Sequence, residues 1–326
     1  GCTNLDCTAT DTLTQESTSM DSAFYDCTSL SAINTSDWDM SIVTSMQYSF
    51  RSTSSLTTVD ASTWDISNLS FGQQMFFFSG LTSIDVSNWT LSSMINMESC
   101  FSNCVSLGNI DVSGWRFTSA SLIKNLNTLF KSCSSFTTLD VSNWNMTGVK
   151  LMAGMFTGCD QLTVIDTKDW DMSEVTNINA MFQSCTAMID LQVIDWDVAK
   201  VENMNNFVNF CTIATAPCGA WQTNSLLYCG RVFKECPNLH TAEVNIDTSL
   251  WSFPLLENAT NMFKSCTDLT TLDTSNWGMG SVTLAPGIFH YCSALEFSSG
   301  ATPFDVSGWD MSSCENITSI FSECYS

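Results

Sequence analysis

Positive charge is scarce in this sequence, which has 10 lysines and arginines and 2 histidines against 33 aspartates and glutamates in 326 residues. Affinity for nucleic acid comes largely from Lys and Arg contacts to phosphate, so the net charge of −23 excludes a nucleic-acid partner. A surface this acidic repels copies of itself and attracts cations or basic partners.

The sequence also lacks a continuous apolar run of about 20 residues, the length that crosses a membrane, although 44% of its residues are hydrophobic. We therefore predict no membrane span. The chain begins with Gly1 and shows no signal-peptide pattern, so either a leader has been removed or this is a segment of a longer parent chain.

Catalytic motifs are missing as well. His240 and His290 are the only histidines, and the sequence contains no G-x-S-x-G, P-loop or H-E-x-x-H pattern. Acidic pairs recur throughout the chain, so they carry no information about a glycosidase site. We predict that the protein is not an enzyme.

One internal repeat dominates what is present. All 11 tryptophans fall into a single series in which most neighbours are 25 or 26 residues apart. Self-similarity at such a period is the signature of a repeat solenoid, in which each unit buries its apolar face against its neighbours. The series comprises Trp38, Trp64, Trp89, Trp115, Trp144, Trp170, Trp196, Trp221, Trp251, Trp277 and Trp309.

The half of the unit before each Trp predicts a short parallel strand, because its apolar residues alternate at the centre, as in residues 81–89 and 136–144. The half after each Trp predicts a short helical return. In residues 171–185, Val175, Ile178, Met181, Phe182 and Cys185 are spaced close to the stripe on one helix face. We predict one solenoid domain of about 12 units over residues 1–326. It has a degenerate first unit at 1–26, regular units over 27–324, and inserts near 116–135, 243–250 and 296–303.

The strand half, L-x-x-L-x-L-x-x-W, resembles the leucine-rich repeat with Trp at the usual Asn or Cys position. The whole unit, L-T-x-L-D-V-S-x-W-D-M-S-x-V-x-x-M-x-x-M-F-x-x-C, resembles the repeat of BspA-like surface proteins of bacteria and protists, over essentially the entire chain. The resemblance implies a leucine-rich-repeat-like α/β solenoid displayed outside the cell, with a role in adhesion or surface architecture and no shared catalytic residues.

The Trp and Cys columns of the repeat are interpreted as core. Stacked aromatic rings bind sugars when exposed, but a Trp that ends a strand favours a buried stack. Cysteines on stacked parallel strands keep their Cβ atoms further apart than a disulfide prefers, so we expect buried free thiols. The column comprises Cys27, Cys104, Cys133, Cys159, Cys185, Cys211, Cys236, Cys266, Cys292 and Cys324. The better disulfide candidates lie off the column, at Cys2, Cys7, Cys100, Cys218, Cys229 and Cys314.

An acidic column is the one candidate cation site. Its aspartates stand four residues before a Trp, on the strand face that points away from the core, and their repulsion is relieved either by Ca²⁺ or by hydrogen bonds from neighbouring Ser and Thr. A calcium-loop pattern is absent. No other cofactor is expected. The column comprises Asp60, Asp85, Asp111, Asp140, Asp166, Asp247, Asp273 and Asp305.

The 16 cysteines indicate an oxidising setting outside the cell or on its surface, in which N-glycosylation is possible. The sequons are at Asn34, Asn68, Asn88, Asn145, Asn258 and Asn316. Neither terminal unit resembles a polar cap, so we predict head-to-tail stacking of copies, or continuation into a parent chain, through Cys2, Leu5, Cys7, Ile317, Ile320 and Phe321. The alternative is a recognition module that binds a glycan or a surface protein through a concave face rich in Ser, Thr and Asp.

Overall fold

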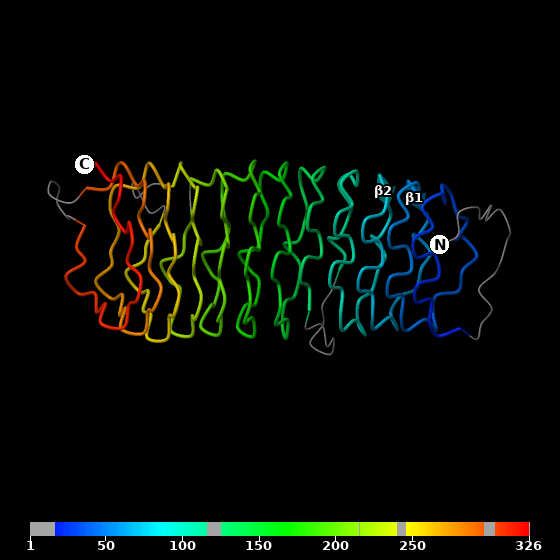
Figure 1. Ribbon diagram of the computed structural model, residues 1–326. Helices are drawn as coiled ribbons and strands as arrows, with labels where there is room; N and C mark the ends of the chain where they lie inside the picture. The colour runs from blue at the N-terminus through cyan, green and yellow to red at the C-terminus, as the bar shows by residue number, and fades with distance from the viewer. Residues whose placement is uncertain (1–16, 116–124, 215, 240–245, 297–303, 326) are drawn as a thin grey trace. The chain divides into compact units, whose positions relative to one another are not determined.

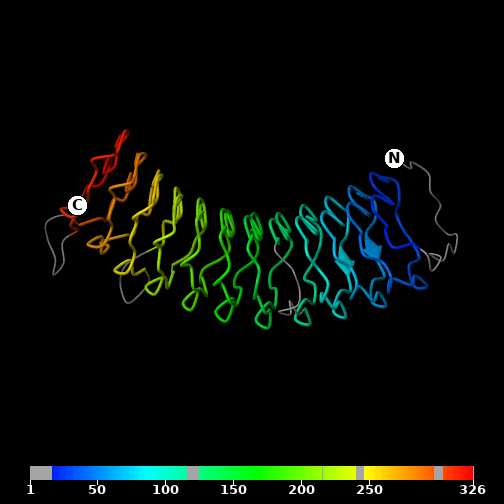
Figure 2. The same ribbon diagram turned by 90° about the horizontal axis from the view of Figure 1, so that it is seen from below.

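The computed structural model describes residues 17–115, 125–214, 216–239, 246–296 and 304–325. The chain forms two compact units, Gly1–Asp166 and Thr167–Ser326. Each unit is built from coils that lie side by side in sequence order (Figure 1, Figure 2), and each coil is one copy of the repeat. The repeat solenoid expected from the Trp spacing is confirmed within each unit.

Regular strands are brief in this fold. The strand β1 (Thr58–Val59) pairs in parallel with β2 (Ser83–Ile84). Thr138 and Val164 form a parallel bridge at the equivalent position of two later coils. The short parallel strands predicted for the half of the unit before Trp are therefore confirmed, although they are only two residues long.

A longer ladder runs along the other half of each unit, through nine residues that end at the Cys position. In residues 177–185, the amides of Ile178, Ala180, Phe182 and Ser184 each donate to a carbonyl of the next coil, over 2.8–3.0 Å. We call these stretches the ladder segments. They are residues 19–27, 45–53, 71–79, 96–104, 125–133 and 151–159 in the first unit, and 177–185, 203–211, 228–236, 258–266, 284–292 and 316–324 in the second.

The alternate amides of a ladder segment are bonded locally. Met181 and Cys185 donate to the carbonyls three residues earlier, over 3.2 and 3.1 Å. The amide of Asn179 donates to the side-chain oxygen of Asn177 over 2.9 Å. Because buried backbone polar groups must find partners, this division of the amides accounts for the Asn that begins 6 of the 12 segments.

The predicted helical returns are wrong, since no helix occurs among the described residues. Two residues in every ladder segment have positive φ, as at Ala180 (55°) and Ser184 (60°). Left-handed backbone interrupts a right-handed helix, and it turns every second amide toward the next coil. Ile178, Met181, Phe182 and Cys185 are buried as expected.

Two aromatic columns fill the interior of each unit. Neighbouring Trp rings of the first unit stack with centroids 5.6–6.4 Å apart, and those of the second unit 5.7–6.3 Å apart. The Phe rings of the ladder segments form the second column, with centroids 5.0–6.0 Å apart in the first unit. Each column continues from coil to coil, so no coil completes its core alone.

The structure describes only parts of the predicted inserts and of the predicted first unit. Residues 125–133, which fall within the first predicted insert, form a regular ladder segment. The parts of the inserts at 116–124, 243–245 and 297–303 lie outside the described residues, as does 1–16 of the predicted first unit.

Candidate functional site

The Trp column is core, as predicted. Every Trp from Trp64 to Trp277 is buried, and only Trp38 and Trp309, in the first and last described coils, are partly exposed. Several indoles also bond the backbone: Trp115 Nε1 donates to the carbonyl of Val86 over 3.1 Å, and Trp196 Nε1 to that of Thr167 over 2.9 Å. The buried rings are therefore not accessible to a sugar ligand.

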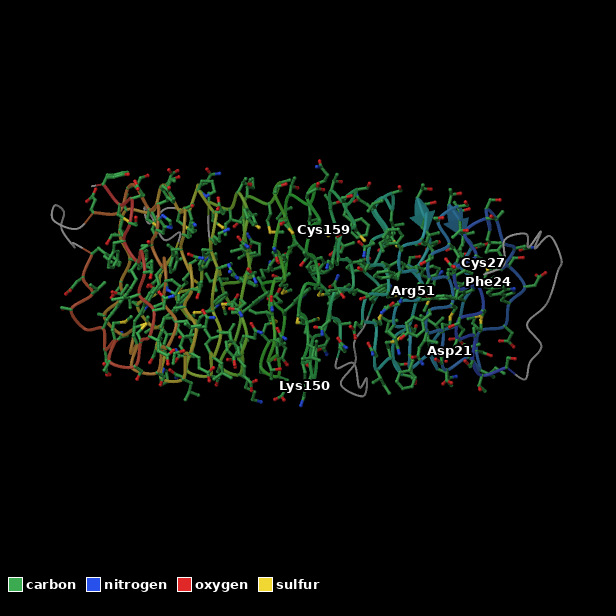
Figure 3. All side chains as sticks on the ribbon, viewed as in Figure 1. Asp21, Phe24, Cys27, Arg51, Lys150 and Cys159 are labelled. Atoms are coloured by element: carbon green, nitrogen blue, oxygen red, sulfur yellow. The ribbon has the colours of Figure 1, made fainter. Side chains whose placement is uncertain are left out.

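The Cys column is buried except at Cys324 in the last coil, which is partly exposed, and its described members are free thiols. Each sulfur with an assigned acceptor donates to a carbonyl of the preceding coil, as Cys159 does to Phe130 over 3.2 Å and Cys266 to Phe233 over 3.0 Å. Figure 3 labels Cys27 and Phe24, both in the first described ladder segment. The predicted burial is confirmed, and the hydrogen bonds supply a structural role that spacing alone did not indicate.

Burial makes these thiols unreactive. Desolvation raises the thiol pKa of Cys104 to about 11 and those of Cys159 and Cys292 to about 12, against an ordinary value of 9.0. Because the thiolate is the nucleophile, the column offers no catalytic cysteine. The described cysteines off the column, Cys100, Cys218, Cys229 and Cys314, are free as well, and Cys2 and Cys7 lie outside the described residues.

The acidic column lies on the surface, as expected. All of its aspartates are exposed except Asp166, which is half-buried. At Asp60, Asp85, Asp111 and Asp140, one carboxylate oxygen accepts two hydrogen bonds from the Ser two residues later. Ser87, for example, donates to Asp85 Oδ1 from its amide over 3.0 Å and from its hydroxyl over 2.7 Å. These bonds hold the pKa of Asp85 below its ordinary value of 3.8.

The hydrogen bonds support the structural alternative for this column over a calcium site. Ser113 bonds Asp111 in the same way, and Ser142 bonds Asp140. The residues that the structure describes contain no group of three or more His, Cys, Asp or Glu side chains placed to hold a metal ion. They also contain no helix long and apolar enough to cross a membrane.

The six sequons differ in how their amide nitrogens are used. Asn68 Nδ2 donates to the carbonyl of Ser41 and Asn88 Nδ2 to that of Ser62, over 2.7 and 3.3 Å, so both bind the preceding coil. Asn258 and Asn316 begin ladder segments and accept an amide bond there. Asn34 and Asn145 are exposed and use only their oxygens in the hydrogen bonds assigned to them.

The predicted assembly residues of the last coil are partly uncovered. Ile317 is 58% exposed, and Ile320 and Phe321 are half-exposed. The amides of Ile317, Ser319 and Glu323 find no acceptor among the described residues, whereas the equivalent amides of the preceding coil, at Ala285, Gly287 and Tyr291, donate to carbonyls of the last coil. Cys2, Leu5 and Cys7 lie outside the described residues.

Sequence reasoning missed the surface on which the coils differ most, the outward side chains of the ladder segments, which we call the ladder face. In the first unit, Arg51 lies among aromatic rings, with its guanidinium carbon 5.6, 5.8 and 4.8 Å from the ring centroids of Tyr25, Tyr48 and Phe77. It also donates to Gln74. Figure 3 labels Arg51 near Phe24 and Cys27. The signal in the sequence was the first residue after Phe in the Phe-x-x-Cys pattern, the position that Arg51 occupies. This residue is small or polar in most units.

Comparison with solved structures finds leucine-rich proteins. A leucine-rich cell surface protein from Faecalibacterium prausnitzii is 14% identical, with 74% of this chain and 70% of that chain covered and a TM-score of 0.37. A leucine-rich-repeat protein from Bacteroides ovatus is 17% identical, with coverages of 85% and 74% and a TM-score of 0.34. No curated protein matches the sequence.

One protein family matches the chain throughout, in overlapping stretches at residues 3–115, 77–190, 109–221, 161–269, 189–302 and 240–326. The repeated match agrees with the coils seen in each unit, and the recognition of a BspA-like leucine-rich-repeat protein made from the sequence is confirmed. The chain thus belongs to the family described as "Mycoplasma protein of unknown function, DUF285".

Proposed function

We propose that this protein is a non-enzymatic solenoid of the extracellular surface whose coils stack end to end, either between copies or within a longer parent chain. Two observations on the last coil carry the proposal. The side chains of Ile317, Ile320 and Phe321 are partly uncovered, and the amides of Ile317, Ser319 and Glu323 find no acceptor among the described residues. Open ladder edges are templates for a further strand.

The first described ladder segment supports the same proposal from the other side. Amides donate from each coil to carbonyls of the next, so the first segment presents acceptors where the last presents donors. The carbonyls of Ser19, Asp21, Ala23 and Tyr25 receive no donor among the described residues, although the equivalent carbonyls of the second segment all do. A donor edge and an acceptor edge fit head to tail, and such a contact propagates instead of closing into a dimer.

The test places charge on the open edge. Ile320→Lys with Phe321→Asp should abolish concentration-dependent growth in light scattering and fibres in electron micrographs. Ile317→Lys, at a more exposed side chain, should weaken growth without disturbing the fold. The matched control is Ile189→Lys, which alters a side chain that is 62% exposed away from that edge. Fibres that survive the changes at 317, 320 and 321, or a wild-type chain that stays monomeric at high concentration, would reject stacking between copies.

A recognition role is the second candidate, and the cluster around Arg51 favours it. Tyr25 and Phe78 are exposed side chains of the two ladder segments next to that of Arg51. The side chains of Gln47 and Gln73, in the segments of Arg51 and Phe78, are hydrogen-bonded to each other. Aromatic faces flanked by amide and guanidinium donors suit a glycan or a protein loop. Tyr25→Ala with Phe78→Ala should reduce retardation in gels containing a neutral glucan; equal retardation of variant and wild type removes this candidate for that ligand.

A further inference from the structure

The few cations of this acidic chain gather on the ladder face. Eight of the 10 lysines and arginines lie in the described residues. Four of them occupy one position, two residues before the Cys position: Arg51 and Lys131 in the first unit, and Lys234 and Lys264 in the second. His290 stands at the same position in the next coil, and no Asp or Glu occupies it in any ladder segment.

In the second unit these residues form a continuous row. The amide of Glu235 donates to the carbonyl of Lys264, and the amide of Ser265 to that of His290, each over 2.8 Å, so Lys234, Lys264 and His290 come from successive neighbouring coils. Arg231 precedes Lys234 by three residues and is exposed. We call Arg231, Lys234, Lys264 and His290 the cationic row.

The charge of this row is only partly balanced. Lys234 lies over the ring of Phe210 at 4.4 Å and pairs with Glu235 at 3.4 Å. Arg231 and Lys264 make no ion pair with the residues that the structure describes. Burial and the charge of Lys264 lower the pKa of His290, and the charge of Glu323 acts in the opposite direction. The positive charge of the row is therefore supplied by Arg231, Lys234 and Lys264, and an acidic partner would balance it.

Two exposed aromatic side chains flank the row in strained backbone. Phe210 has a φ of 64° and Tyr291 a φ of 63°, and their exposed fractions are 44% and 48%. Glycine occupies the equivalent position at Gly158, where the left-handed conformation is unstrained. A bulky residue in this conformation costs about 1–2 kcal/mol, and an exposed ring gains little from burial within its own chain. The same left-handed conformation occurs at this position in every ladder segment, so the exposed rings, and not the backbone, set Phe210 and Tyr291 apart from most coils.

We propose that the cationic row, with Phe210 and Tyr291, binds the acidic column of a second copy of this chain side by side. This lateral contact uses a different surface from the end-to-end contact and does not depend on it. The cationic row and the acidic column each repeat once per coil. Two copies that lie side by side therefore place successive cations of one copy against successive carboxylates of the other.

The acidic column has the geometry that such a contact needs. Asp85 and Asp111 each use Oδ1 for their Ser, and Oδ2 accepts no hydrogen bond among the described residues. Their Ser partners lower both pKa values, and the neighbouring charge of Asp85 acts in the opposite direction on Asp111. The carboxylates stay ionised, oriented and mutually repelled until a cation approaches. The acidic column and the cationic row are present together in every copy, so a second copy supplies a local surface of complementary charge to each.

The experiment measures association by sedimentation velocity in the Ile320→Lys, Phe321→Asp background, where end-to-end contacts are blocked. Arg231→Glu with Lys264→Glu should weaken lateral association by at least about tenfold, because like charges are then opposed across the contact. The matched control, Lys150→Glu with Lys200→Glu, changes the net charge equally at exposed lysines outside the ladder segments. Figure 3 shows Lys150 at the edge of its coil.

Exchanging the charges of the two surfaces distinguishes specific pairing between them from an effect of the net charge of the chain. Asp85→Lys with Asp111→Lys should also lose self-association, and a mixture of this variant with the Arg231→Glu, Lys264→Glu variant should recover it. Association should fall in 1 M salt, where screening acts within about 3 Å. Loss of association in the control, no recovery in the mixture, or no lateral association in the end-blocked chain would each overturn the proposal. So would tight binding of heparin at the cationic row without self-association, which would assign the surface to an anionic glycan.

Discussion

The two halves of the repeat are equally regular in sequence but are held together differently. The half before Trp is joined between coils by brief pairing such as β1 with β2, and its surface repeats the same Asp and Ser. In most ladder segments half of the amides donate to the next coil and the others bond locally. This backbone bonding is independent of the outward side chains, so those side chains vary most. The ladder segments, whose outward side chains vary, are therefore the half of the repeat that can acquire specific contacts with a partner.

The largest expected effect concerns the ladder half at alkaline pH. The buried thiols have pKa values raised from 9.0 to about 11 at Cys104 and about 12 at Cys159, Cys211 and Cys292. The unfolded chain therefore loses these protons first, and stability falls as pH rises from 9 toward 12. The slope is about 1.4 kcal/mol per pH unit for each such thiol.

Urea midpoints at pH 7.5, 9 and 10.5 measure this decline. The variant Cys159→Ala with Cys211→Ala should show a shallower slope, because two of the titrating groups are removed. A midpoint that does not change with pH would show that these cysteines are not buried thiols.

The core that both halves share should be the next most sensitive element. Trp221 is fully buried and stacks on Trp196 and Trp251 at 6.3 and 6.2 Å. Trp221→Ala leaves a cavity and breaks the column, at a cost of about 3–5 kcal/mol. Trp221→Phe should cost less because a ring remains. Urea unfolding at neutral pH measures both, and equal losses for the two variants would contradict the role assigned to stacking.

The Asn that begins a ladder segment should have a moderate effect. Asn203 Oδ1 accepts the amide of Asn205 over 3.0 Å. Asn203→Ala leaves that amide without its partner, at a cost of about 1 kcal/mol. Asn203→Asp keeps the acceptor and should retain most of the stability. If both variants lose the same amount in urea unfolding, the side-chain oxygen is not what matters at this position.

The exposed half before Trp should respond least. Asp85→Ala removes two bonds on the surface and should change the free energy of unfolding by about 0.5 kcal/mol or less. Because Ser87 lowers the folded pKa of Asp85 below 3.8, this contribution is present above pH 3.8 and disappears as pH falls below it. Millimolar Ca²⁺ should leave the melting temperature unchanged, and an increase would restore the calcium interpretation.

The candidate surfaces were predicted unevenly. The acidic column and the buried Trp and Cys columns were visible because one residue type recurs at one position of the repeat. The cationic row was not, because Arg231, Lys264 and His290 differ in type and come from different units of the repeat. Their proximity follows from the stacking of ladder segments, and the left-handed backbone at Phe210 has no signature in a phenylalanine.

The sequence by itself determined the repeat, its core positions and the acidic surface, since periodic burial needs only the spacing of apolar residues. Tertiary structure decided between a helix and a ladder. Ile178, Met181, Phe182 and Cys185 have the i, i+3, i+4, i+7 spacing of a helix, and two left-handed residues produce the same inward positions in a chain of turns. The choice depends on where the amides find acceptors, and a neighbouring coil that offers carbonyls at 2.8–3.0 Å exists only after the coils have stacked.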